Sequence, residues 1–177
     1  MTIATIIVWR TIDIIIMGNK SRVSVSLKLA VSIIFCQAIG GIGAFFTIPA
    51  IDTWYKFLKK PMFTPPDWVF MPVWIFLFLL MGVAMFIVWA KPTAEDKTPA
   101  AVTFVIQAGL NSIWPILFFS FHSPLAALIE IMALWIMVIF NAFVFWKVSK
   151  TAGYLLIPYV VWITFAGIIN AYVLVLN

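Results

Sequence analysis

Apolar residues occupy five long stretches of the chain, and short polar segments separate them. The stretches cover approximately residues 28–48, 65–90, 100–120, 125–146 and 154–176. Because a helix rises 1.5 Å per residue, about 20 apolar residues cross a hydrocarbon core of about 30 Å. The pattern therefore predicts an all-α membrane protein, with a bundle of five transmembrane helices formed by residues 28–177.

The composition is that of a protein embedded in a lipid bilayer. Its 177 residues are 65% hydrophobic and 10% charged, whereas soluble domains carry about 25% charged residues. Aromatic residues make up 17% of the chain, including 9 Trp and 17 Phe. Interfacial belts need fewer rings than this, so we expect some rings to face inward.

Residues 1–27 form a separate N-terminal tail. The apolar part, residues 1–16, is too short to span and is interrupted by Arg10 and Asp13, which predicts an interfacial helix or an irregular tail. A second interpretation takes Met17 as the true start, which leaves a short basic lead-in before the first span.

Prolines and a capping pattern mark the expected helix ends. Pro49 is expected to end the first span, and Thr64 to cap the second, with Asp67 completing a capping box. Pro72 and Pro115 lie inside the second and third spans, where each predicts a kink.

The distribution of basic residues predicts the orientation of the bundle. Five spans place the two termini on opposite sides of the membrane. The N-terminal side carries eight basic residues: Arg10, Lys20, Arg22, Lys28, Lys91, Lys97, Lys147 and Lys150. The opposite side carries three: Lys56, Lys59 and Lys60. The positive-inside rule therefore predicts a cytoplasmic N-terminus, in the cell membrane if the source is bacterial or archaeal.

Polar residues within the spans predict the interior of the bundle. Gln107, Asn111 and Trp114 share one face of the third span, because their spacing is i, i+4, i+7. Glu130 and Asn141 lie three turns apart on one side of the fourth. Polar groups in hydrocarbon need partners, so both faces should point inward. For Glu130 a functional role and a structural hydrogen bond to a neighbouring span both stay open.

The connector between the first two spans has the composition of a lid. Residues 51–63 combine aromatic and thioether side chains with three lysines. Such a surface suits a flat, apolar, partly anionic molecule. The lid residues singled out are Trp54, Lys60 and Pro61.

The remaining reactive residues predict no cofactor. The single cysteine, Cys36, is expected to be a small buried residue, and the single histidine, His122, a loop residue without haem or metal ligands nearby. No phosphate loop, dinucleotide fingerprint or nucleophile-base pair occurs. The basic residues are scattered, which argues against a nucleic-acid partner.

Several fragments together resemble one known family. They are W-Y-x-x-L-x-K-P-x-x-x-P-P at residues 54–66, V-F-x-P-V-W at 69–74, M-G at 81–82, L-N-x-x-W at 110–114 and A-G-x-L-L-x-P-Y-x-x-W-x-x-F-A at 152–166. Their order and spacing resemble the translocator protein, or tryptophan-rich sensory protein (TspO/MBR), family over residues 28–177.

The resemblance implies a five-helix membrane protein, often a homodimer, that binds porphyrins and, in eukaryotic relatives, cholesterol and synthetic ligands. It implies that the first connector folds over a pocket between the helices. The ligand-binding positions carried over from the family are Tyr55, Trp74, Asn111, Trp114, Trp162 and Ala166. The eukaryotic sterol motif needs a basic residue shortly after the last tyrosine, and Tyr172 is followed only by VLVLN. Sterol recognition by that motif is therefore not expected.

Three functions follow from these observations. The first is a membrane protein that binds a porphyrin, another tetrapyrrole-like molecule or another flat apolar ligand, with a stress-sensing or regulatory role. The second is an enzyme that degrades the bound porphyrin by light-dependent oxidation, with Trp74 and Trp162 as electron or radical donors. The third, a transporter of such ligands, is disfavoured because the chain shows no repeat between halves.

Overall fold

The computed structural model describes residues 25–92 and 96–177, and throughout these ranges the regular structure is helical. Its elements are α2 (Val25–Ile51), η1 (Tyr55–Phe57), α3 (Asp67–Ala90), α4 (Thr98–Pro115), η2 (Ile116–Ser120), α5 (Pro124–Val148), α6 (Lys150–Leu155) and α7 (Ile157–Leu176). Within the described residues, five spans are long and apolar enough to cross a membrane: α2, α3, α4 with η2, α5, and α6 with α7. The predicted five-helix membrane bundle is confirmed.

The predictions for the N-terminal tail lie outside the described residues. These are the interfacial helix at residues 1–16, the alternative start at Met17 and the positions of Arg10, Lys20 and Arg22.

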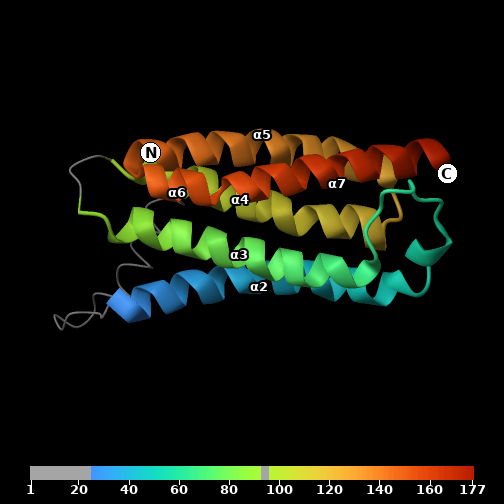
Figure 1. Ribbon diagram of the computed structural model, residues 1–177, viewed down its shortest axis with the longest axis horizontal. Coiled ribbons are helices and arrows are strands. Elements are labelled where there is room, and N and C mark those ends of the chain that lie inside the picture. Colours follow the sequence, from blue (N-terminus) through green and yellow to red (C-terminus); the bar gives the residue numbers. More distant parts are fainter. Residues whose placement is uncertain (1–24, 93–95) are drawn as a thin grey trace.

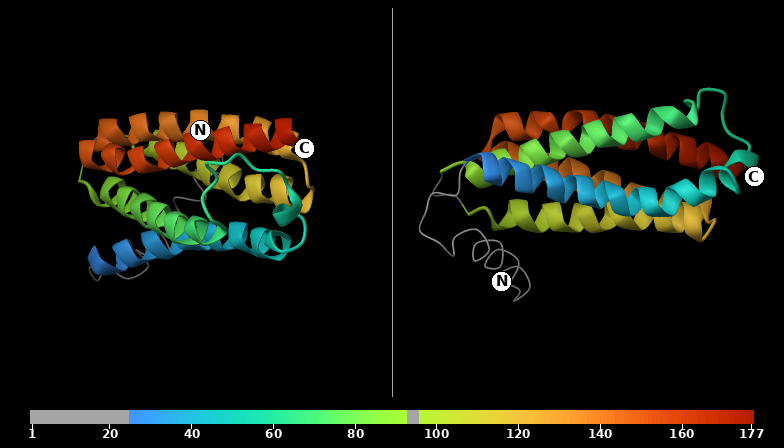
Figure 2. Two further views of the ribbon diagram at one scale, coloured as in Figure 1. Left: turned by 45° about the vertical axis from the view of Figure 1, so that its right-hand side comes forward. Right: turned by 90° about the horizontal axis from the view of Figure 1, so that it is seen from below.

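The spans form a closed ring in which α2 packs on α3 and α4, and α5 packs on α4, α6 and α7. Figures 1 and 2 show the start of α2 and the C-terminus at opposite ends of the bundle, as an odd number of spans requires. The C-terminal span meets α3 mainly through α6. Side chains rather than close backbone contact therefore join α3 to α7.

Two glycines bring helix backbones into contact. A Cβ on Gly82 of α3 would lie 2.8 Å from Ile33 Cα of α2, and a Cβ on Gly153 of α6 would lie 3.0 Å from Trp146 Cα of α5. Small residues permit such approaches between membrane helices, where dispersion contacts replace the hydrophobic effect as the driving force. These two sites fix how closely α2 meets α3 and α5 meets α6.

Two expected helix boundaries are wrong. The residue that precedes α3 is Pro66 rather than Thr64, no side chain caps that helix, and the Thr64 hydroxyl is buried without a hydrogen-bond partner in the described structure. Thr64 and Pro65 each precede a proline, which disfavours the α conformation, and Pro66 itself has an extended backbone, so the helix begins only at Asp67. Pro49 does not end α2, which continues to Ile51, since a proline in the last turn removes only one backbone bond.

The last two spans also differ from the expected pattern at their ends. The fifth span begins at Lys150, so only Ser149 remains of the connection expected at residues 147–153. The fifth span is also interrupted at Leu156, two residues before Pro158.

In the third span, Pro115 marks the point where α4 changes into the π-helical turn η2. A proline lacks the N–H that continues the α-helical hydrogen-bond ladder, which explains why the interruptions of the third and fifth spans both occur near a proline.

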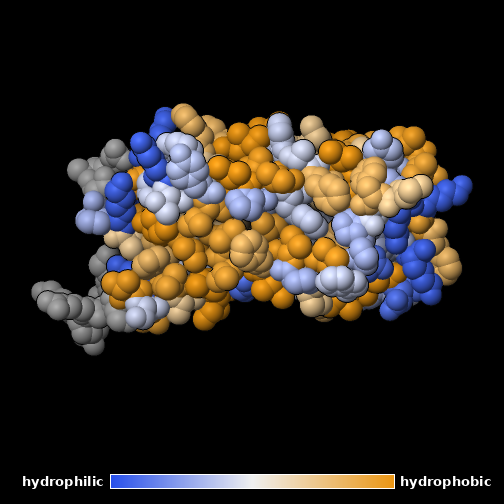
Figure 3. Space-filling view, viewed as in Figure 1, coloured by the Kyte–Doolittle hydropathy of each residue, from blue (hydrophilic) through white to orange (hydrophobic). Residues whose placement is uncertain are grey.

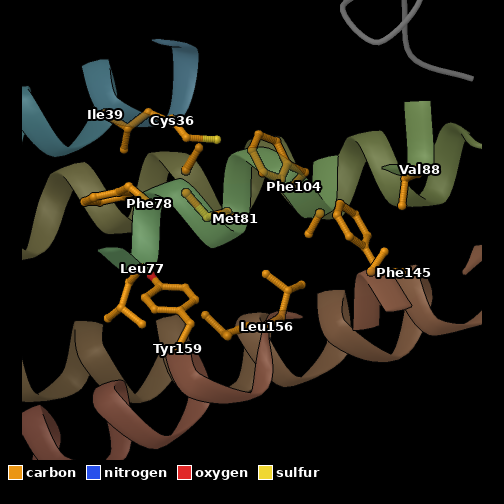
Figure 4. Packing of buried hydrophobic residues seen from close by; sticks show 14 of the residues in the cluster. Cys36, Ile39, Leu77, Phe78, Met81, Val88, Phe104, Phe145, Leu156 and Tyr159 are labelled. Carbon is orange, nitrogen blue, oxygen red and sulfur yellow. The ribbon is translucent and has the colours of Figure 1, made fainter. Parts of the chain in front are cut away.

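The face of the bundle seen in Figure 3 is mostly apolar along its middle and hydrophilic at both ends. Large side chains that face outward include Phe45, Ile75 and Ile129, and they form the surface that contacts lipid. Figure 4 shows the interior, where Cys36, Phe78, Met81, Phe145 and Tyr159 pack between spans. Cys36 is fully buried, as expected.

The interior also holds a chain of polar side chains that joins α4, α5 and α3. Thr103 Oγ1 donates to Asn141 Oδ1 over 2.7 Å, and Asn141 Nδ2 donates to Gln107 Oε1 over 2.7 Å. Gln107 Nε2 in turn contacts Met81 Sδ at 3.0 Å. Gln107 and Asn141 therefore face inward, as their spacing predicted, and act as interhelical hydrogen-bonding groups.

Candidate functional site

The connector between α2 and α3 crosses one end of the bundle and closes it (Figure 2). Its start is tied to α2, because Thr53 Oγ1 donates to Pro49 O over 2.9 Å and Trp54 N donates to Ala50 O over 3.1 Å. These bonds satisfy carbonyls that the end of α2 leaves unpaired.

Tyr55 anchors the connector in the bundle. Its side chain is buried against Phe118 and Phe119 of η2, with ring centroids 6.2 and 5.6 Å away. Lys60 Nζ lies 3.6 Å from the centre of the Tyr55 ring, a cation–π contact. Burial raises the pKa of the Tyr55 hydroxyl to about 12, and the Asp67 carboxylate adds to the shift, so the phenol stays protonated. Pro61 is also buried.

Trp54 joins the connector to η2 and to the turn between η2 and α5. Its ring stacks on His122 at 4.5 Å and meets the edge of Phe118 at 5.4 Å. His122 has φ 50, a left-handed conformation in which histidine is enriched. His122 is therefore a loop residue, as expected, and it also supports the connector.

The second half of the connector is joined to the end of α7. Lys59 N donates to Asn177 Oδ1 over 2.9 Å, and Asn177 Nδ2 donates to Lys59 O over 3.0 Å. Phe63 packs edge-on against Tyr172 at 5.3 Å. The connector therefore contacts α2, η2 and α7 before it enters α3.

A group of aromatic rings fills the space between α3 and α7 beneath the connector. The rings of Trp74 and Trp162 lie 6.5 Å apart at an interplanar angle of 87°. Trp74 also stacks on Phe78 at 5.5 Å and meets the edge of Tyr159 at 6.2 Å, while Trp162 meets Phe70 at 5.7 Å. Both tryptophans are only partly buried. In this perpendicular arrangement the edge of one indole ring meets the face of the other, one of the geometries that aromatic pairs prefer.

Polar side chains border this aromatic group. Asn111 Nδ2 donates to the Tyr159 hydroxyl oxygen, and Trp114 Nε1 donates to Asn170 Oδ1 over 3.2 Å. Asn170 Nδ2 then donates to Pro124 O over 2.8 Å. In contrast, Trp162 Nε1 is buried without a partner among the described residues. Trp162 therefore keeps a hydrogen-bond donor free for a ligand.

The predicted site residues fall into two adjoining sets. Trp74, Asn111, Trp162 and Ala166 belong to the spans around Tyr159, and Ala166 is a small residue packed on the core. Tyr55 and Trp54 pack instead around Phe118 at the closed end. Trp114 contacts both hydrophobic clusters and stacks on Phe118 at 5.0 Å. The lid and the inner residues therefore meet at Trp114.

An open groove of about 540 Å³ lies elsewhere, between the end of α2 and the turn after η2. It is lined by Ala44, Phe45, Phe46, Ile48, Pro49, Ala50, Thr53, Phe119, Ser120 and His122. This groove shares no residue with the predicted ligand-binding set. It is a second place where an apolar molecule can lie, and an experiment must distinguish it from the aromatic group.

Several contact residues lie outside the predicted ligand-binding set. Tyr159 and Phe70 complete the aromatic group, Phe118 packs with Trp114 and Tyr55, and Asn177 holds the connector. The sequence pattern had placed Tyr159 on the same helical stripe as Trp162 and Ala166, whereas Phe70 and Phe118 were not singled out. No sequence signal pointed to Asn177, since its contact joins residues 118 positions apart.

Comparison with known proteins identifies relatives over most of the chain. Residues 32–176 match the model of the TspO/MBR family. The chain is 44% identical over 151 residues to the tryptophan-rich protein TspO of Archaeoglobus fulgidus, covering 85% of this chain and 97% of that protein. It is 34% identical over 145 residues to the translocator protein of Bos taurus, covering 80% and 85%, and 31% identical over 147 residues to a tryptophan-rich sensory protein of Cereibacter sphaeroides, covering 81% and 91%.

Proposed function

The chain belongs to the TspO/MBR family, and on that premise we propose that this multi-pass membrane protein binds a porphyrin, another tetrapyrrole-like molecule or another flat apolar ligand and has a sensory or regulatory role. The name of the Cereibacter sphaeroides relative, a tryptophan-rich sensory protein, supports the proposed sensory or regulatory role.

One observation carries the proposed binding site. Between α3 and α7 the bundle is joined by aromatic side chains rather than by close helix packing, and the connector covers this end. Rings held by side-chain contacts can move apart more readily than packed backbones. A flat ligand would then replace ring–ring contacts between Trp74 and Trp162 with contacts to its own face.

The polar groups around the rings would orient the ligand. Trp162 Nε1 offers a free donor, and Asn111 is held in place by Tyr159. Lys59 and Lys60 lie at the outer end, where the carboxylates of a porphyrin would meet water and cations. Exposed ion pairs contribute about 0 to 1 kcal/mol, so the rings would supply most of the affinity.

A titration with protoporphyrin IX, followed by tryptophan fluorescence, tests the proposal. Losing one stacking partner should weaken binding about threefold to tenfold, and Trp162→Ala should exceed that because it also removes buried apolar surface. Lys60→Ala should cost less. Trp146→Ala is the matched control, since Trp146 packs on Tyr154, outside the aromatic group. An equal loss for Lys60→Ala and Trp162→Ala, in folded protein, would place the ligand on the surface.

Direct contact between Trp74 and Trp162 favours one second function, light-dependent oxidative degradation of the bound porphyrin by dioxygen. Paired tryptophans beside an excited porphyrin are suitable electron donors. Products formed from protoporphyrin IX under illumination in air should be compared between wild type and Trp74→Phe. If the protein degrades porphyrin enzymatically, a product formed by wild type should be missing or reduced with Trp74→Phe. If it only binds porphyrin, wild type and Trp74→Phe should give the same products.

A further inference from the structure

Glu130 is the one carboxylate side chain among the buried polar residues of the described structure. It is 8% exposed, and both carboxyl oxygens are buried with no hydrogen-bond partner in residues 25–92 and 96–177. The buried amides behave differently: Gln107, Asn111, Asn141 and Asn170 each make a hydrogen bond. The sequence left two roles open for Glu130, a functional one and a structural hydrogen bond to a neighbouring span. The described residues provide no such hydrogen bond.

An unpartnered carboxyl is unfavourable for folding. A buried acceptor without a donor loses its hydration and gains no compensating bond, and a charged one loses more. A leucine of similar size at this position would pack without that penalty. Local departures from good packing tend to occur where function requires them.

The position of Glu130 connects it to the aromatic group. It lies on the inward stripe of α5 between Ala127, which packs with Trp114 and Phe118, and Ile131, which belongs to the cluster around Tyr159. Glu130 therefore lies where the two hydrophobic clusters meet, and the cluster that contains Tyr159 also packs against Trp74 and Trp162.

We infer that Glu130 contacts the ligand and selects, among flat apolar molecules, those that carry an N–H or O–H donor at the end inserted into the bundle. A carboxyl group retains an acceptor oxygen whether or not it is protonated, so the selection does not depend on its charge. A ligand donor would supply the bond that the folded protein leaves unmade. The inference rests on the proposed function, because it adds a polar contact to the same site.

Two fluorescent probes of one shape test this selection. 1-Pyrenemethanol carries an O–H group where 1-methylpyrene carries only hydrogen. In protein reconstituted in one lipid, the dissociation constant of 1-pyrenemethanol divided by that of 1-methylpyrene should rise about threefold to thirtyfold in Glu130→Leu relative to wild type. Glu130→Gln keeps an acceptor oxygen and should retain most of the selectivity. Partition into lipid is the same for all variants, so the change in the ratio reports the protein contact.

Thermal unfolding without ligand separates this role from a structural one. We expect Glu130→Leu to unfold at the same temperature as wild type or higher, because an unpaired polar group is removed. A lower unfolding temperature together with equal weakening of both probes would overturn the inference and make Glu130 structural. An unchanged ratio would overturn it as well. If neither probe binds, or if binding survives Trp162→Ala, the proposed site itself fails and the inference fails with it.

Discussion

Replacing Asn177 with alanine removes the two hydrogen bonds that join the connector to the end of α7. Asn177 Oδ1 accepts from Lys59 N at 2.9 Å, and Asn177 Nδ2 donates to Lys59 O at 3.0 Å. Each bond contributes about 0.5 to 1.5 kcal/mol, and both are exposed, so the pair should contribute about 1 to 2 kcal/mol. The population of the detached connector should therefore rise about fivefold to thirtyfold.

Hydrogen exchange at the Lys59 amide and the rate of ligand dissociation both report this change. Asn177→Ala should increase each by that factor, because the connector must open for a ligand to leave. Asn177→Asp keeps the acceptor for Lys59 N and loses the donor, so it should give an intermediate effect. Faster exchange at Lys59 with unchanged ligand dissociation would show that the connector does not control access to the site, and the reasoning would be refuted.

Four further predictions concern orientation, packing and association. A reporter fused after Asn177 should be external, and one inserted in the 93–98 turn should be cytoplasmic, because the N-terminal side carries eight basic residues and the opposite side three. The reverse pattern would refute the charge argument. Gly82→Leu should lower the free energy of unfolding by about 1 to 3 kcal/mol, since its side chain would meet the α2 backbone, whereas Gly41→Leu, with open space around it, should leave the monomer unchanged. If Gly41 lies in a homodimer contact, crosslinking in lipid should detect a dimer in wild type and less of it in Gly41→Leu. Detection of monomer alone in wild type would refute the homodimer hypothesis. Asn141→Leu should cost about 1 to 3 kcal/mol in a denaturation experiment, because Gln107 and Thr103 lose their shared partner; no loss would mean that water replaces it.

The sequence was sufficient to predict the number of spans and the inward polar faces. Apolar runs of bilayer length and i, i+4 spacing are local properties of a sequence. The described structure confirms the five spans, and it confirms the inward faces because Gln107, Asn111 and Asn141 are buried. The basic residues of the described part also separate between the two ends, with Lys91 and Lys147 at one and Lys59 at the other. The assignment of those ends to cytoplasm and exterior stays a prediction.

Helix boundaries and long-range contacts were harder to predict. The Thr64 capping pattern was outweighed by the two following prolines, and α2 runs past Pro49 because a late proline costs little. Whether Glu130 finds a partner depends on contacts between spans, which no local pattern encodes; among the described residues it has none. The ligand-binding set, Tyr55, Trp74, Asn111, Trp114, Trp162 and Ala166, stays a prediction, although the structure brings its inner members together.

Photolabelling most directly tests where the ligand binds. Protein in lipid would be incubated with a photoreactive porphyrin, illuminated at the wavelength that activates the label, and mapped by mass spectrometry of its peptides. The account predicts adducts on residues 70–78 of α3 and 159–166 of α7, which carry the Trp74 and Trp162 rings, and competition by unlabelled protoporphyrin IX. Adducts confined to residues 44–53 and 119–122 would place the ligand in the open groove and contradict the account.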